Sequence, residues 1–122
     1  MSAQQFHGEV RPRGPSVLLD LSGDIDGNAE QGLRALYHEA VAGGPATVVL
    51  NFEQVSYINS TGIALIVGLL AEARKAHQTV LACGLSPHYQ EIFQVTRLSD
   101  FMPMFSDEDA ALAGTPSPAP AS

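Results

Sequence analysis

Apolar residues follow a helical spacing in two long stretches of the chain. In residues 28–42 they recur every three or four positions, as Leu33, Leu36 and Tyr37 illustrate, and this predicts an amphipathic helix. Residues 60–77 predict a second helix, whose apolar positions extend over more than one face. Such a helix is either buried between neighbouring elements or presents part of its second face to a partner.

Short apolar runs on either side of these helices predict strands. Residues 47–52 and 79–83 read as buried strands, and the first is apolar on both faces, as in a central strand that helices cover. Residues 17–21 predict a further strand, and weaker strand patterns lie at 6–11 and 101–105.

The order of these elements favours an α/β fold. Two more helices, one opening at Ser86–Pro87 and one following Ser106, complete the order β-β-α-β-α-β-α-β-α. Strands that alternate with helices form a sheet with right-handed crossovers. Because the first two strands lie close together in the chain, we expect a mixed sheet of four or five strands with an antiparallel edge, and about four helices.

The chain divides into one domain and two short ends. Residues 1–5 are small and polar, and we expect them to be frayed. Residues 114–122 are uncharged and contain three prolines, so we expect a disordered tail. The folded domain is therefore predicted over residues 6–113.

Charge and composition narrow the classes of partner. The 122 residues carry a formal net charge of −7, which argues against a nucleic-acid-binding surface and against adsorption to anionic membranes. The longest apolar run, residues 62–71, is about half as long as a bilayer requires, so we expect no direct membrane insertion. The single cysteine, Cys83, excludes an intrachain disulfide and fits a reducing compartment. These features favour a cytoplasmic protein.

The stretch from residue 55 to residue 70 is the most informative for function. A predicted buried strand leads into a loop with Asn59, Ser60, Thr61 and Gly62, and an apolar helix follows. In an α/β sheet, sites gather beyond the carboxyl ends of the strands, and a helix N-terminus there is favourable for a phosphate group. From the residues alone, Ser60 is either the N-cap of this helix or a functional group.

The same loop resembles the signature of the STAS domain family, which takes its name from sulfate transporters and anti-sigma-factor antagonists. The signature is a strand, an acid, Ser, Ser or Thr, Gly and an aliphatic residue, opening a helix. Its matching residues here are Asn59, Ser60, Thr61, Gly62 and Ile63. Residues 21–26, 48–52 and 80–87 resemble the family's strand-end turn, central strand and fourth strand.

The resemblance implies a regulator that switches between partners. Antagonists of this family bind an anti-sigma factor that is also a serine kinase, and binding releases a sigma factor. The kinase then phosphorylates the serine of the loop, and the complex separates. Ser60 takes the position of that serine, with Thr61 as the weaker candidate. The resemblance also implies a partner-binding surface made of Asp24, Asp26, Asn59, Ser60, Thr61, Gly62 and Ile63.

Two features leave alternatives open. Asn59 stands where the family usually has an acid, which favours an unphosphorylated STAS module of a transporter-accessory or stress-signalling complex as the second interpretation. The helix N-terminus near Ser60 allows a third, a small-ligand or nucleotide sensor. Asp24 and Asp26 are, from the residues alone, turn and capping acids for the helix at 28–42.

No pattern in the sequence indicates catalysis or metal binding. The four histidines are scattered without ligand spacing, and the chain has one cysteine, so no metal site is predicted. No nucleophile has a base at a recognisable spacing, so we expect a protein that is not an enzyme and binds no cofactor. A partner kinase would itself supply ATP and Mg²⁺.

Overall fold

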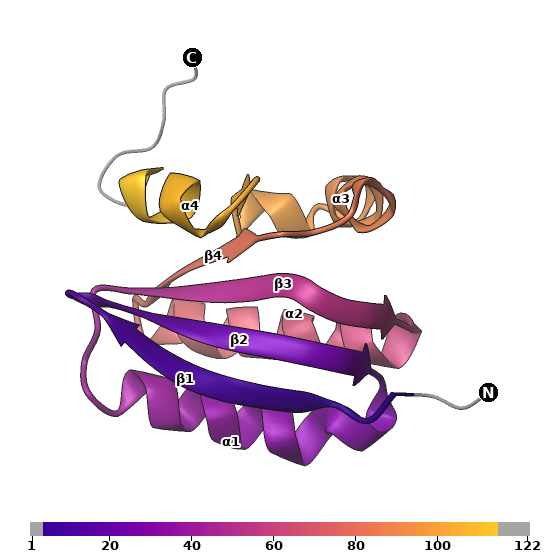
Figure 1. Ribbon diagram of the computed structural model, residues 1–122, viewed down its shortest axis with the longest axis horizontal. Helices are drawn as coiled ribbons and strands as arrows, with labels where there is room; N and C mark the ends of the chain where they lie inside the picture. The colour runs from indigo at the N-terminus through magenta and orange to yellow at the C-terminus, as the bar shows by residue number, and fades with distance from the viewer. Residues whose placement is uncertain (1–3, 115–122) are drawn as a thin grey trace.

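The computed structural model describes residues 4–114 and contains one five-stranded sheet in the order β1-β2-β3-β4-β5 (Figure 1). The strands are β1 (His7–Arg13), β2 (Ser16–Ile25), β3 (Thr47–Ile58), β4 (Thr79–Cys83) and β5 (Met104–Phe105). β1 pairs with β2 antiparallel, and the other neighbours pair parallel. The predicted mixed sheet with an antiparallel edge is thereby confirmed.

Three of the four α-helices in the described range fill the crossovers between the parallel strands, and the fourth follows β5. They are α1 (Glu30–Val41), α2 (Ser60–Lys75), α3 (Pro87–Val95) and α4 (Glu108–Gly114), with short 3-10 helices η1 (Gly27–Ala29) and η2 (Leu98–Asp100). The first two α-helices match the predicted spans to within a few residues. The predicted strand at 101–105 is shorter than expected, because η2 precedes it and only its last two residues pair with β4.

The predicted boundaries of the two chain ends differ from the structure at Gln4 and Gly114. Residues 1–5 were expected to be frayed, but Gln4 exchanges two hydrogen bonds with Asp24, from its N–H to the carboxylate at 3.2 Å and from the Asp24 N–H to its carbonyl at 3.0 Å. The predicted tail was expected to begin at Gly114, which instead ends α4. Residues 1–3 and 115–122, the remainder of both expectations, lie outside the described residues.

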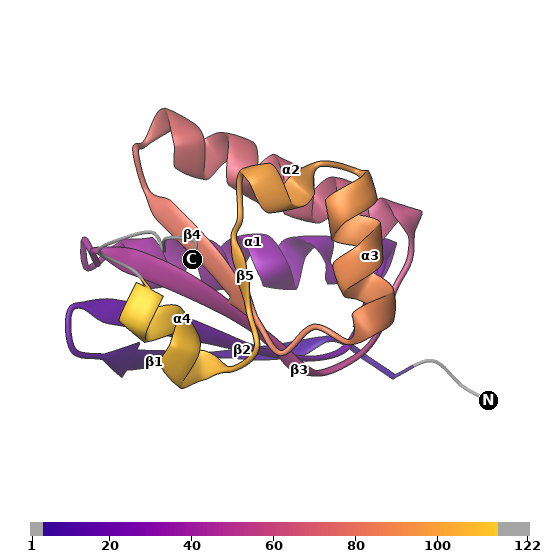
Figure 2. The same ribbon diagram turned by 90° about the horizontal axis from the view of Figure 1, so that it is seen from above.

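Helices cover the two faces of the sheet unequally (Figures 1 and 2). The first three helices pack on one face, because consecutive right-handed crossovers bring them to the same side. The main core lies there, around Leu19, Leu50, Ile66 and Phe93, each fully buried. α4 covers part of the opposite face in a smaller core formed by Leu18, Val49, Leu81, Cys83 and Ala111. Burial raises the pKa of the Cys83 thiol to about 11, so it packs as a small apolar side chain.

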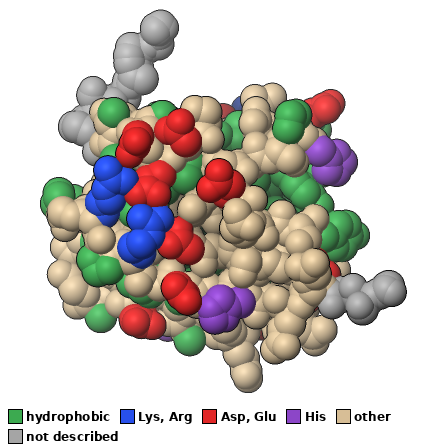
Figure 3. Space-filling view, viewed as in Figure 1, with side chains coloured by type: hydrophobic (Ala, Val, Ile, Leu, Met, Phe, Trp, Pro, Cys, Tyr) green, Lys and Arg blue, Asp and Glu red, His purple; other side chains and the backbone are tan. Residues whose placement is uncertain are grey.

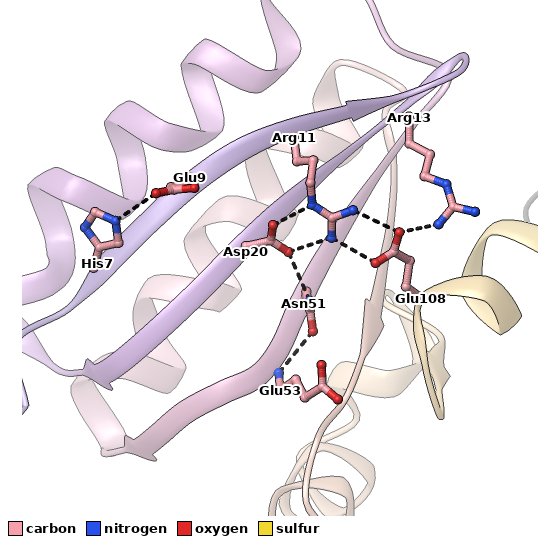
Figure 4. Close-up of polar contacts among 8 residues, drawn as sticks. All are labelled: His7, Glu9, Arg11, Arg13, Asp20, Asn51, Glu53 and Glu108. Carbon is pink, nitrogen blue, oxygen red and sulfur yellow. Dashed lines mark hydrogen bonds and ion pairs between the residues drawn. The ribbon is translucent and has the colours of Figure 1, made fainter.

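A polar cluster attaches α4 to the sheet (Figure 4). The Arg11 guanidinium on β1 donates to both carboxylate oxygens of Asp20, at 2.7 and 3.0 Å, and to those of Glu108, at 2.8 and 3.0 Å. Asn51 donates to Asp20 at 3.0 Å, and Arg13 also donates to Glu108. Figure 3 shows the resulting surface, in which basic side chains lie among acidic ones. In this cluster the arginines neutralise the carboxylates that bind them, and its role is to connect α4 to the sheet.

The strands that lead to the loop at Ser60 are longer than predicted. β2 continues past residue 21, where the predicted strand ended, to Ile25, and β3 continues past residue 52 to Ile58. The two strands end in register, because Ile25 pairs with Ile58. Their ends therefore place the residues after Ile25 beside the residues after Ile58.

We predict a pH-dependent contribution from the Arg11 cluster. Arg11→Gln should lower the free energy of unfolding by about 1 kcal/mol near neutral pH, since the groups are partly exposed and screened by solvent. The Arg11 guanidinium holds the pKa of the Asp20 and Glu108 carboxyls below their ordinary values of 3.8 and 4.5. The stabilisation is therefore present above those ordinary values and is lost as the pH falls through the folded-state pKa values.

Urea denaturation of both proteins at several pH values checks this prediction. The difference between wild type and Arg11→Gln should shrink on acidification. Arg34→Gln is the control, because its pair with Glu30 is more than half exposed and should contribute little. A difference that stays constant down to about pH 3 would contradict the predicted role of the carboxylates.

Candidate functional site

Asn59 starts the helix on which the candidate site lies. Its side-chain oxygen accepts the Gly62 N–H at 2.8 Å, and its carbonyl accepts the Ile63 N–H at 2.9 Å. Its own N–H donates to the Ile25 carbonyl at 3.3 Å. The interpretation of Ser60 as the N-cap is therefore wrong, because Asn59 fills that position and Ser60 is the first residue within α2.

Ser60 and Thr61 are exposed on the first turn of α2. The Ser60 hydroxyl makes no hydrogen bond to any residue that the structure describes, so its oxygen is free to react or to contact a partner. The first N–H groups of a helix lack partners within it, and the helix dipole is positive at this end. The position therefore accommodates added negative charge without rearrangement of the fold.

Gly62 and Ile63 belong to the same helical turn but face the interior of the domain. Gly62 is buried, and a Cβ atom there would lie 1.9 Å from the Ile25 carbonyl oxygen. Only glycine permits the helix to pass so close to the end of β2. Ile63 is half-buried and packs against the main core. Both residues were predicted to bind a partner, and the structure places them mainly in the packing of α2.

The two predicted aspartates have different environments. The Asp26 carboxylate accepts the Asn28 N–H at 3.0 Å and caps the 3-10 helix η1, which precedes α1. It was predicted to cap the helix at 28–42, but α1 itself begins after Ala29 without a side-chain cap. Asp26 is half-exposed at the end of β2, the strand whose last residue pairs with Ile58. Asp24 is only 8% exposed and accepts the Gln4 N–H, so its carboxylate is not part of the exposed surface.

A groove of about 280 Å³ begins at Thr61 and runs between α1 and α2. Its walls include Ala64 and Gly68 on α2 and Glu30 and Arg34 on α1. Thr61 also lies close to η1, since a Cβ on Gly27 would be 3.7 Å from its methyl group. A partner that covers Ser60 therefore finds a concave surface immediately beside it.

Sequence reasoning missed Tyr57. This residue lies three positions before Ser60 in the extension of β3, and its side chain is 53% exposed. Exposed tyrosines are frequent anchors of protein interfaces. The sequence signal was the aromatic residue in this loop, but the strand was expected to end at residue 52, so no orientation could be assigned to it.

A metal-ligand cluster and a membrane-spanning helix are both absent from the described residues. Within residues 4–114, no group of three or more His, Cys, Asp or Glu side chains could hold a metal ion. No helix in that range is long and apolar enough to cross a membrane.

Comparison with known proteins identifies the family. Residues 7–111 match the model of the STAS domain, so the chain belongs to the STAS domain family. Over 86 residues it is 30% identical to BtrV of Bordetella bronchiseptica, a protein named as an anti-sigma factor antagonist. That alignment covers 70% of this chain and 73% of BtrV.

Solved structures show the same fold. An anti-sigma factor antagonist from Mycobacterium paratuberculosis superposes with a TM-score of 0.81 at 18% identity, covering 93% of this chain and 96% of that one. The anti-sigma factor antagonist SpoIIAA in its unphosphorylated form matches at a TM-score of 0.65 and 26% identity, covering 91% and 96%. Its phosphorylated form, from Bacillus, matches at the same TM-score and 27% identity, covering 89% and 98%.

We predict that Asn59 stabilises the start of α2 and that Ser60 does not. Asn59→Ala should lower the free energy of unfolding by about 1 kcal/mol, because the Gly62 N–H loses its acceptor. Asn59→Asp should keep full stability, since a carboxylate oxygen can accept the same bond and is favoured by the helix dipole. Denaturant unfolding measures the stability of both variants. An equal loss of stability in Ser60→Ala would show that Ser60, and not Asn59, is the N-cap.

α2 contains one buried glycine, Gly62, and one exposed glycine, Gly68, so the same substitution can be compared at both positions. Gly62→Ala should destabilise the fold by about 3 kcal/mol or prevent folding, because the new methyl group meets the Ile25 carbonyl. Gly68→Ala, where a Cβ meets nothing within 4 Å, should stabilise the chain by about 1 kcal/mol. Thermal unfolding compares the two, and similar behaviour of both variants would refute the close approach at Gly62.

Proposed function

We propose that this chain is an anti-sigma factor antagonist that acts by partner switching. In this proposal it binds an anti-sigma factor that is also a serine kinase, and phosphorylation of Ser60 ends the complex. The exposed Ser60 hydroxyl on the first turn of α2, free of hydrogen bonds to the described residues, is the observation that carries the proposal. Thr61, also exposed, is the second candidate for phosphorylation.

The chemistry of a phosphoryl group supports such a switch. Phosphorylation adds a charge of about −1.5 to −2 and three acceptor oxygens. At the first turn of a helix the added charge is compatible with the fold, because the dipole is positive there. In a docked complex the same group would repel acidic side chains and disturb packing. The switch would therefore act on the interface and leave the fold intact.

The similarity to SpoIIAA supports the same conclusion. This chain matches the unphosphorylated and the phosphorylated structures of that protein equally well, with a TM-score of 0.65 in both cases. The match to BtrV, at 30% identity, adds a relative named for the same role. The proposed contact surface comprises Asp26, Tyr57, Asn59, Ser60 and Thr61, which are exposed or half-exposed.

Asn59 is compatible with partner binding, and phosphorylation of Ser60 is the step that its missing carboxylate affects. Its amide oxygen performs the capping that an aspartate would perform, but it adds no carboxylate beside Ser60. In the proposed mechanism the kinase supplies ATP, Mg²⁺ and the catalytic groups, so this chain acts by binding alone. Because anti-sigma factors act on the transcription machinery, we propose the cytoplasm as the location.

The test is partner capture with four baits, analysed by mass spectrometry. Wild type and Ser60→Ala should retain a kinase-fold anti-sigma factor. Ser60→Asp should lose it, with affinity reduced at least about tenfold, which corresponds to ~1.4 kcal/mol. Ser106→Asp is the matched control, because it adds the same charge at an exposed serine before α4 and should bind normally.

Phosphopeptide mapping of residues 59–61 follows the capture. Phosphate on Ser60 is the expected result after incubation with the captured kinase and ATP. Equal binding of all four baits would overturn the switch and assign Ser60 to a constitutive STAS interface. Loss of the partner with Ser106→Asp alone would place the interface on the α4 side.

A further inference from the structure

Large apolar side chains remain exposed at the middle of α2 and on the segment around the end of α3. In the part of the chain that the structure describes, four large hydrophobic residues are exposed: Tyr57, Val67, Val95 and Phe101. Val67 and Phe101, which are 47% and 54% exposed, line one groove of about 340 Å³. Val95, 73% exposed, immediately precedes a lining residue of the same groove.

The groove lies between α2 and the segment that leads from α3 to β5. Val67, Ala71 and Arg74 form the α2 wall, and Arg97 and Phe101 belong to the other. Figure 2 shows this segment, which includes η2, passing beside α2. We name it the α2–η2 groove. Its floor is apolar and its rim carries two guanidinium groups.

The charge of the groove is opposite to that of the chain. Of the six Lys and Arg residues in a chain of net charge −7, Arg74, Lys75 and Arg97 lie at this end of α2. The Arg74 guanidinium stacks over the Phe101 ring, 5.2 Å from its centre, and makes no ion pair with any described carboxylate. Arg97 pairs with Asp100 at 3.1 Å, but both groups are more than half exposed.

Among the Lys and Arg residues, all of which lie in the described range, Arg11 and Arg13 are bound by Asp20, Glu108 and Asp109. Arg34, like Arg97, has one exposed carboxylate partner. Arg74 and Lys75 make no ion pair with a described carboxylate, and Arg74 lines the groove. The α2–η2 groove therefore combines exposed apolar surface with positive charge that lacks a full complement of carboxylates. This combination matches a ligand that offers apolar side chains flanked by acids.

We propose that the α2–η2 groove binds a short acidic amphipathic segment of a partner protein. Apolar side chains of that segment pack on Val67 and Phe101, and its carboxylates pair with Arg74 and Arg97. The site goes beyond the proposed switch, because Val67 and Arg74 lie about 10 and 20 Å along α2 from Ser60. Binding here is independent of the charge at Ser60.

Three other occupants fit less well. A second copy related by a two-fold axis would bring the same arginines face to face. Residues 115–122 of this chain contain no acid and no large apolar side chain. An anionic membrane would be repelled by the overall charge of −7.

The experiment selects ligands from a displayed library of random peptides, with the intact chain as bait. The proposal expects enriched peptides that combine carboxylates with apolar residues, measured afterwards by fluorescence anisotropy. Arg74→Glu and Phe101→Ser should each weaken their binding at least about tenfold. Val67→Asp, at a helix position that is 47% exposed, should weaken the binding as well. Circular dichroism and thermal unfolding establish that each variant is folded.

Two matched variants complete the design. Arg34→Glu makes the same charge change on α1 and should leave peptide affinity unchanged. Ser60→Asp should also bind the peptides normally, so failure of this proposal is distinguishable from failure of the switch at Ser60.

Several outcomes would overturn the groove proposal. These are no enrichment, enrichment of basic peptides, or binding that survives the groove substitutions. Binding of the chain to phosphatidylserine vesicles that Arg74→Glu abolishes would assign the groove to a membrane. Concentration-dependent dimers that the same variant dissociates would assign it to a second copy.

Discussion

The junction at the Ile25 carbonyl determines where the loop with the candidate site lies. This oxygen accepts the Asn59 N–H at 3.3 Å, and the absence of a side chain on Gly62 lets α2 pass beside it, since a Cβ there would be 1.9 Å away. The contact joins the end of β2 to the start of α2 and follows from the in-register pairing of Ile25 with Ile58. It brings Asp26 and Ser60, which are distant in sequence, to one edge of the sheet.

α2 thereby acquires two ends with different electrostatic character. Its first turn, with Ser60 exposed and Asn59 as the cap, is compatible with added negative charge because the helix dipole is positive there. Its last turn carries Arg74 and Lys75, which suit the negative end of the dipole. In a chain of net charge −7, this makes the far end of α2 an uncommon positive region. One helix can therefore support a phosphorylation-controlled contact and a separate charge-selective one.

The sheet that carries this helix is covered on both of its faces. The main core packs α2 against the sheet, while α4 closes part of the opposite face over Leu18, Val49 and Cys83. Arg11 contributes by linking Asp20 on β2 to Glu108 on α4. A charge change at an exposed residue such as Ser60 is remote from these contacts, so it can alter binding without loss of stability.

The sequence by itself determined the fold class, the order of elements and the position of Ser60 at a helix start, because hydrophobic periodicity and the motif around Gly62 are local signals. The tertiary structure alone decided that Asp24 is buried and that β2 and β3 extend to Ile25 and Ile58. The Asn59 cap is a local contact between residues three apart, which the sequence analysis assigned to Ser60 because both residue types suit that position. Strand pairing and long-range hydrogen bonds overrode the turn preference of Gly23 and Asp24. The groove at Phe101 likewise depends on segments that meet only in the folded chain, which no local pattern records.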